Sequence, residues 1–244
     1  MNVTKILIQN LHMYKNTFFN KKYKKKILEL LNNNKCDLKY KNSNGETLLI
    51  LACKIGFEDL ALKLLDNYLD NCNITYKCSK ILTRHDDYNK IVRYSTKRDA
   101  LFYALMNNMK RVVLKLLEHK SIINNLNSSY LIYSKSFSFF STSPLIFSYT
   151  PLIIACKKNM KKIALKILEY NCSNIDHTSS ETFSKDETTY KGTLQPAIYY
   201  AYKNNMKEVV SKIMSLDYKL TGMTKLSEKY QYKIRMYNDK INKK

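Results

Sequence analysis

Residues 44–56 read Asn-Gly-Glu-Thr-Leu-Leu-Ile-Leu-Ala-Cys-Lys-Ile-Gly, and the apolar pattern around Ala52 recurs three more times in the chain. The matching alanines are Ala104, Ala155 and Ala201. Leu or Ile stands three residues before each alanine, and apolar residues recur eight, nine, twelve and thirteen residues after it. Because the four copies agree at every apolar position, we interpret the chain as an array of internal repeats.

Each copy has the spacing of two short helices joined by a tight turn. The residue three before the alanine and the alanine itself share one face of a first helix, and the later apolar residues follow the 3.6-residue period of a second helix. Four residues after the alanines stand Gly56, Asn108, Asn159 and Asn205, residue types that tolerate the left-handed backbone of a tight turn. The predicted structural core of the repeats consists of Leu49, Ala52, Leu64, Leu65, Leu101, Ala104, Leu116, Leu117, Leu152, Ala155, Ile167, Leu168, Ile198, Ala201 and Ile213.

The start of the first copy resembles an ankyrin repeat. Asn44-Gly45-Glu46-Thr47-Leu48-Leu49, followed by Ala52 and Gly56, is similar to the ankyrin pattern D-G-x-T-P-L-H-x-A-x-x-x-G. Thr150-Pro151-Leu152 contains the T-P-L element, in which threonine caps the first helix and proline suits its first position. The resemblance covers residues 42–215. It implies an all-α, ankyrin-like helical solenoid of four repeats.

The other two copies depart from the ankyrin pattern at their start. The second begins Asp99-Ala100-Leu101, without the proline, and we expect Asp99 to cap its first helix. The fourth begins Pro196-Ala197-Ile198, without the threonine, so that its start is the least well defined.

Both ends of the chain are predicted to be capping elements. Residues 1–41 contain two helical patterns, at Thr4–Met13 and Tyr23–Asn33, which we interpret as a degenerate N-terminal capping repeat. Residues 216–244 form a basic segment with an apolar stripe, and we expect a C-terminal capping helix and tail there. The stripe consists of Leu226, Tyr230, Ile234, Tyr237 and Ile241.

The repeats are separated by insertions. The alanines are 52, 51 and 46 residues apart, whereas ankyrin units recur about every 33 residues. The extra residues lie at 71–98, 121–149 and 173–193. We predict an extended hairpin with a basic tip for the first, an aromatic segment with strand-like alternation at residues 135–139 for the second, and a mobile polar loop for the third.

The first two insertions supply the candidates for contact with a partner protein, because aromatic and arginine side chains are enriched at binding hot spots. Alternatively, the aromatic rings fold back and fill the neighbouring repeat. The candidates are Arg84, His85, Arg93, Tyr130, Tyr133, Phe137, Phe139, Phe140 and Phe147.

Charge supports a second function. The chain has 42 basic and 20 acidic residues, a net charge of +22, and such a charge attracts nucleic acid and other polyanions without sequence specificity. All but five of the basic residues are lysine, and Asn, Ile and Tyr are abundant, a composition typical of AT-rich genomes. The composition resembles that of ankyrin arrays from large DNA viruses and some intracellular parasites, which implies a host factor among the candidate partners.

The sequence provides no candidate catalytic, metal-binding or cofactor-binding residues. It contains no Gly-rich phosphate loop, no G-x-S-x-G and no H-E-x-x-H, and its cysteines and histidines lack the spacing of metal ligands. It also lacks a secretory h-region and an apolar run long enough to span a membrane. We therefore expect a monomeric, intracellular protein of the cytoplasm or nucleus, which acts as a non-catalytic scaffold for another protein.

Overall fold

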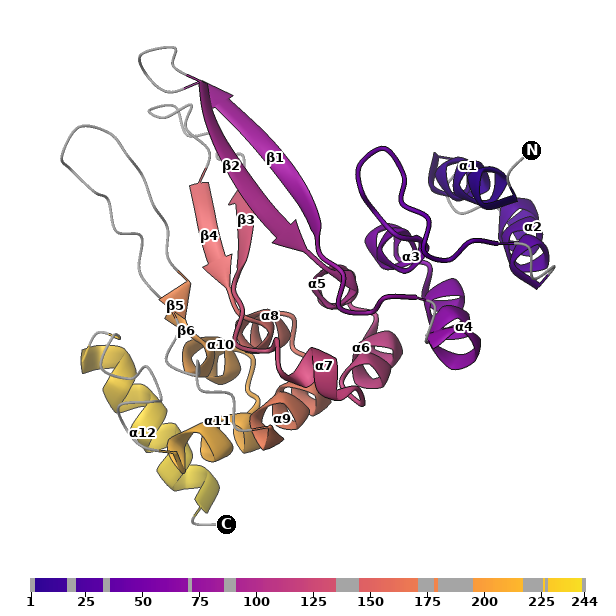
Figure 1. The fold of residues 1–244 in the computed structure, drawn as a ribbon. Coiled ribbons are helices and arrows are strands. Elements are labelled where there is room, and N and C mark those ends of the chain that lie inside the picture. The colour runs from indigo at the N-terminus through magenta and orange to yellow at the C-terminus, as the bar shows by residue number, and fades with distance from the viewer. Residues whose placement is uncertain are drawn as a thin grey trace. The chain divides into compact units, whose positions relative to one another are not determined.

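The computed structural model describes residues 3–16, 21–32, 36–69, 72–85, 91–134, 145–170, 178–179, 195–216, 226 and 228–242. Over these residues the fold is all-α and ankyrin-like, with pairs of short helices separated by two-stranded extensions (Figure 1). The chain divides into two compact units. Unit 1 consists of Met1–Lys80 and Arg98–Glu118, and unit 2 consists of Ile81–Lys97 and His119–Lys244.

Unit 1 contains the N-terminal helices and the first two repeats. Its helices are α1 (Val3–Asn16), α2 (Lys21–Asn32), α3 (Leu48–Ile55), α4 (Glu58–Asn67), α5 (Ala100–Met106) and α6 (Lys110–Leu116). The two helices expected in the capping region are present, each shifted or extended by one to three residues. α1 packs against α2 and α3, α3 against α5, and α4 against α6. First helices therefore stack on first helices and second helices on second helices.

Unit 2 repeats this arrangement. Its helices are α7 (Lys120–Ile123), α8 (Pro151–Lys157), α9 (Lys161–Glu169), α10 (Ala197–Lys203), α11 (Lys207–Met214) and α12 (Glu228–Asn242). α8 packs against α10, α9 against α11, and α12 against both α10 and α11 (Figure 1). Ile234 of the predicted C-terminal stripe is fully buried, and Tyr237 stacks edge-on against Tyr202. α12 therefore covers the end of the fourth repeat.

The turn between the two helices of each repeat has the predicted left-handed residue. The φ angles are 78° at Gly56, 58° at Asn108, 55° at Asn159 and 54° at Asn205. In all four copies the N–H of the following residue donates to the carbonyl of the repeat's alanine at 2.9 Å. The N–H of the turn residue donates to the carbonyl one residue after that alanine, at 3.0–3.2 Å. These two bonds form the Schellman motif, which satisfies the last carbonyls of a helix.

Three of the four first helices have the side-chain caps that the sequence predicts. Thr47 Oγ1 accepts from the N–H of Ile50 at 3.3 Å, and Thr150 Oγ1 accepts from Ile153 at the same distance. Asp99 caps α5 through Oδ1, which accepts from the N–H of Phe102 at 2.8 Å. Pro196 precedes α10 without a side-chain cap, so the loss of threonine in the fourth copy leaves this helix start without a polar side-chain partner.

Within each unit the repeats share an apolar core. Every residue that the sequence assigns to the repeat core is buried, with an exposed fraction of at most 3%. The residues directly after the turn, Phe57, Met109, Met160 and Met206, are buried as well. One helix pair cannot bury an apolar face by itself, so stacking of neighbouring repeats is what removes these side chains from water.

An asparagine side chain links neighbouring first helices within each unit. Asn107 Nδ2 in unit 1 donates to the carbonyl oxygens of Cys53 and Lys54 at 2.7 and 3.0 Å. Asn204 in unit 2 stands at the same position of its repeat and donates to the carbonyl of Cys156 at 2.7 Å. These amides give a second hydrogen-bond donor to a carbonyl at the end of the preceding first helix, which also accepts from the N–H of the turn residue.

Ion pairs link neighbouring second helices. Lys24 pairs with Asp59 between α2 and α4, and Lys115 pairs with Asp66 between α6 and α4. Lys161 of α9 pairs with Glu208 of α11 at 2.5 Å. All of these side chains are substantially exposed, so each pair adds little stability and mainly fixes the lateral register of the helices.

The insertions form two-stranded extensions. β1 (Cys78–His85) pairs with β2 (Ile91–Arg98), which confirms the strand pair predicted for the first insertion. The predicted basic tip lies at residues 86–90, outside the described residues. In the second insertion, β3 (Tyr130–Ser134) pairs antiparallel with β4 (Leu145–Tyr149), and the register places Tyr130 opposite Tyr149. The strand-like alternation predicted at 135–139 lies outside the described residues. α7 opens the second insertion and was not expected, because four residues are too few to carry a helical period.

The third insertion is described only at Thr178–Ser179, so the mobile polar loop predicted there lies outside the described residues. β5 (Thr178–Ser179) pairs antiparallel with β6 (Gln195–Pro196), which directly precedes α10. The rest of residues 173–193 lies outside the described residues.

The loss of stability on replacing the turn residue should depend on whether the new residue tolerates the left-handed backbone conformation. We expect Asn159→Ala to lower the free energy of unfolding by about 1 kcal/mol, because alanine lacks the short polar side chain that lets asparagine tolerate the left-handed region. Asn159→Gly should change it little, because glycine adopts this backbone freely. Urea unfolding followed by circular dichroism measures both, and an equal loss in the two variants would contradict a backbone origin.

The buried cysteines should resist alkylation in the native protein. Burial raises the pKa of the Cys72 and Cys156 thiols to about 12 and raises that of Cys53 as well. A raised pKa lowers the thiolate fraction, which is the reactive form. We expect iodoacetamide to label Cys36, which is only partly buried, before these three, with site-resolved mass spectrometry as the measurement. Labelling of Cys53 at the rate found in denaturant would contradict this order.

Candidate protein-interaction surface

The first helices of the repeats are mostly buried, but the position two residues after the repeat alanine reaches solvent in every copy. Two residues after the repeat alanine stand Lys54, Met106, Lys157 and Lys203. Lys54 and Met106 are half-buried, whereas Lys157 and Lys203 are exposed. This position therefore lies on the accessible face of each first helix, and lysine occupies it in three of the four copies.

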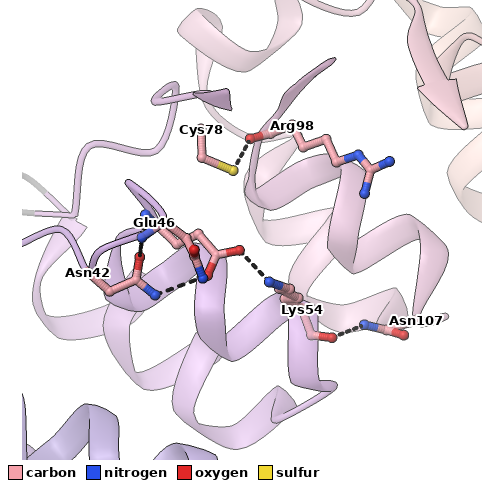
Figure 2. Close-up of polar contacts among 7 residues, drawn as sticks. Asn42, Glu46, Lys54, Cys78, Arg98 and Asn107 are labelled. Carbon is pink, nitrogen blue, oxygen red and sulfur yellow. Dashed lines mark hydrogen bonds and ion pairs between the residues drawn. The ribbon is translucent and has the colours of Figure 1, made fainter. Parts of the chain in front are cut away.

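In unit 1 the charge at this position is neutralised within the repeat. Lys54 Nζ pairs with Glu46 Oε1, and the Glu46 side chain is only 5% exposed (Figure 2). Asn42 holds the other carboxylate oxygen, since its Nδ2 donates to Glu46 Oε2 at 3.0 Å. The carbonyl oxygen of the Asn42 side chain also accepts from the N–H of Glu46 at 2.8 Å. Lys54 thus satisfies a buried carboxylate and is not a surplus surface charge.

The base of the β1–β2 hairpin is fixed close to α5. Cys78 Sγ donates to the carbonyl of Arg98 at 3.2 Å, which joins the first residue of β1 to the last of β2 (Figure 2). The Arg98 guanidinium lies 5.2 Å from the centre of the Phe102 ring of α5. Burial raises the pKa of Tyr103, which the hydrogen bond from Arg98 lowers in part. These contacts anchor the hairpin to the repeat through buried or half-buried groups.

In unit 2 the lysines of the same position lie over tyrosine rings. Lys157 Nζ lies 4.5 Å from the centre of the Tyr149 ring and 5.7 Å from that of Tyr200, and it donates to the Tyr149 hydroxyl at 2.7 Å. Lys203 Nζ lies 5.8 Å from the ring centre of Tyr199 and 5.9 Å from that of Tyr230. A lysine ammonium is attracted by the negative face of an aromatic ring at such distances.

The tyrosines also contact one another, which produces a continuous row. Tyr199 and Tyr200 meet edge to face with ring centres 5.5 Å apart, and Tyr199 and Tyr230 do so at 5.0 Å. The contacts run from the end of β4 across α8 and α10 to α12, which lie side by side (Figure 1). We call this surface the Tyr–Lys row. Its members are Tyr149, Lys157, Tyr199, Tyr200, Lys203 and Tyr230.

The two tyrosines at the α12 end of the row have opposite pKa shifts. Burial raises the pKa of Tyr199, and its hydrogen bond to Tyr230 adds to the increase. The pKa of Tyr230 is lowered, first by the hydrogen bond with Tyr199 and then because Lys203 lies nearby. The two shifts share one cause, the side-chain hydrogen bond between Tyr199 and Tyr230. The row is thus held in place by hydrogen bonds as well as by ring contacts.

The sequence candidates for partner contact lie in the two-stranded extensions. Tyr130 is 1% exposed, so its ring belongs to the core of unit 2, in agreement with the alternative that the rings fold back. Arg84 lies in β1 with His85, and Arg93 lies in β2. Tyr133 lies in β3 and Phe147 in β4, while Phe137, Phe139 and Phe140 fall outside the described residues.

Sequence reasoning did not single out the Tyr–Lys row. A signal was present, because lysine recurs two residues after the alanine in three copies and tyrosines occupy positions 199, 200 and 202 of the fourth. Periodicity alone cannot tell that Lys54 is neutralised by a buried carboxylate while Lys157 and Lys203 lie on aromatic rings. That difference depends on which side chain the neighbouring segment brings close.

Among the described residues, no group of three or more His, Cys, Asp or Glu side chains could hold a metal ion. None of the described helices is both long and apolar enough to cross a membrane.

Comparison with known proteins gives a limited result. No protein-family model matches the sequence, and no curated protein matches it. Among solved structures, the Legionella pneumophila effector AnkC matches over 100% of this chain and 73% of its own, with 13% sequence identity and a TM-score of 0.44.

Removal of the lysine from the Glu46–Lys54 pair should destabilise the protein more than removal of the glutamate charge. We expect Lys54→Met to lower the free energy of unfolding by about 3 kcal/mol, because it leaves a buried carboxylate without its cation. Glu46→Gln should cost about 1 kcal/mol, since the half-exposed Lys54 ammonium can be hydrated. The double variant should be more stable than Lys54→Met alone. Urea unfolding of the four proteins tests the cycle, and strictly additive losses would contradict a direct pair.

Proposed function

We propose that the protein is a protein-interaction scaffold without catalytic activity of its own. The observation that carries the proposal is the Tyr–Lys row. Its lysines are exposed, its tyrosines on α10 and α12 are half-buried, and Tyr149 at the end of β4 is buried beneath them. Aromatic side chains give a large contact area with few rotatable bonds, and the contacts among these residues already restrict their conformations. Binding on such a surface costs little additional ordering entropy.

The extensions provide a second region for partner contact. Their strands join consecutive repeats, and insertions in repeat arrays collect on one face, which is often the binding face. Arg84, His85 and Arg93 in the first hairpin and Tyr133 and Phe147 in the second remain candidates for this contact. A partner that touches both the row and an extension would bury more surface than either offers alone.

A polyanion is the competing ligand, and the net charge of +22 is the observation that favours it. Neutralisation of phosphates by lysine releases counterions, so the affinity for nucleic acid would fall steeply as salt increases. An interface that combines aromatic contacts with a few ion pairs depends less on salt.

We expect the full-length protein, after nuclease treatment, to retain discrete partner proteins from cytosol at about 0.15 M and at about 0.5 M salt. Affinity capture followed by mass spectrometry is the measurement. A variant without residues 131–148 tests the second extension, and circular dichroism checks that its helix content is retained. Recovery of nucleic acid alone, or loss of every protein at the higher salt, would replace the scaffold with the polyanion function.

A further inference from the structure

We propose that the outward face of α12 pairs with the same face of a second copy of this chain, in antiparallel orientation, to form a weak dimer. The inference goes beyond the scaffold function and does not depend on it. Its basis is the set of side chains that α12 exposes and their symmetric placement around Ile234.

α12 exposes two large apolar side chains on one side. Tyr232 is 66% exposed and Met236 is 41% exposed, and Met13 is the one other exposed large apolar side chain in the part of the chain that the structure describes. Ile234, midway between Tyr232 and Met236, is fully buried. Two residues correspond to about 200° of rotation in a helix, so both exposed side chains lie almost opposite Ile234. They form an apolar pair on the side of α12 that faces away from α10 and α11.

Charged residues flank this apolar pair with the same symmetry. Lys229 stands five residues before Ile234 and Asp239 five residues after it, and both are exposed. The helix dipole favours acidic residues near the start of a helix and basic residues near its end. Lys229 lies in the first turn of α12 and Asp239 in the last, so the stability of α12 by itself does not account for either charge.

An antiparallel second copy matches these residues in complementary pairs. When the two α12 helices pair with Ile234 of each at the same level, Tyr232 of one copy lies opposite Met236 of the other. Lys229 of each copy then lies opposite Asp239 of the other. A methionine sulfur makes favourable contacts with an aromatic ring, and the two ends of the contact each form an ion pair. A parallel pair would place each charge opposite the same charge, so charge complementarity selects the antiparallel orientation.

Other charges keep this association weak. Lys233 and Arg235 lie beside the contact, close to their own counterparts in an antiparallel pair, and the whole chain has a net charge of +22. Their long side chains can turn the charged groups towards water, but the repulsion is not removed. A contact between two single helices is also smaller than a standard interface, so we expect a dissociation constant on the order of 100 µM.

The test is sedimentation equilibrium of the full-length protein over a concentration range that spans this value. We expect a monomer–dimer equilibrium in the parent protein and a monomer throughout the range in Tyr232→Gln. Lys229→Glu and Asp239→Lys should each weaken the dimer by roughly five- to ten-fold, because each substitution acts on two symmetry-related ion pairs. The double variant Lys229→Glu/Asp239→Lys exchanges the two charges and should restore the affinity of the parent.

The charge exchange separates a specific contact from indirect effects. Both single substitutions agree better with the helix dipole than the natural residues, so neither should weaken α12 itself. They change the net charge in opposite directions, so general repulsion cannot explain weakening by both. Lys162→Glu makes the same charge change as Lys229→Glu at an exposed position of α9 and should not weaken the dimer. Circular dichroism checks that every variant keeps the helical content of the parent.

Three results would overturn the proposal. They are a parent protein that is monomeric over the whole range, a dimer that Tyr232→Gln does not affect, and a double variant as weak as the single ones. If the parent is monomeric and Tyr232→Gln loses a protein that the parent captures from cytosol, the face binds that protein and not a second copy. A dimer that depends on α12, without any captured protein, would support the pairing and refute the scaffold function.

Discussion

The reversal between the two helices of each repeat is the constraint on which the rest of the structure depends. Gly56, Asn108, Asn159 and Asn205 adopt positive φ, and the following N–H reaches back to the alanine carbonyl at the same 2.9 Å in every copy. This geometry ends the first helix within two turns and starts the second helix antiparallel to it. Without the reversal, neither the apolar core nor the stack of first helices could form.

The alanine that accepts this bond is fully buried in all four copies. A larger side chain there would hold the neighbouring first helix further away. Close approach of the first helices also allows Asn107 and Asn204 to reach carbonyls of the preceding repeat. The left-handed turn, the buried alanine and the asparagine hydrogen bond therefore act together. They determine which side chains of neighbouring repeats are in contact.

The same helix pair presents different surface groups in different repeats. Lysine two residues after the alanine satisfies a buried carboxylate in the first repeat and lies over tyrosines in the third and fourth. The helix pair of the repeat fixes the position of the lysine Cα. The neighbouring segments determine which groups the lysine ammonium contacts. Glu46 is supplied by the turn before α3, Tyr149 by the end of β4 and Tyr230 by α12. Differences in the connecting segments thus give the lysine two residues after the alanine two different environments, a buried carboxylate in the first repeat and tyrosine rings in the third and fourth.

The sequence by itself determined the repeats, their helix pairs, the left-handed turns and the caps at Thr47, Asp99 and Thr150. All of these depend on local backbone preference and on apolar period, which a single chain displays directly. It also predicted the first hairpin. Only the tertiary structure decided that Tyr130 is buried and that Lys157, Lys203 and four tyrosines form one row. Those outcomes depend on contacts between residues far apart in the chain, such as Lys157 and Tyr200, and sequence periodicity contains no information about which distant side chains become neighbours.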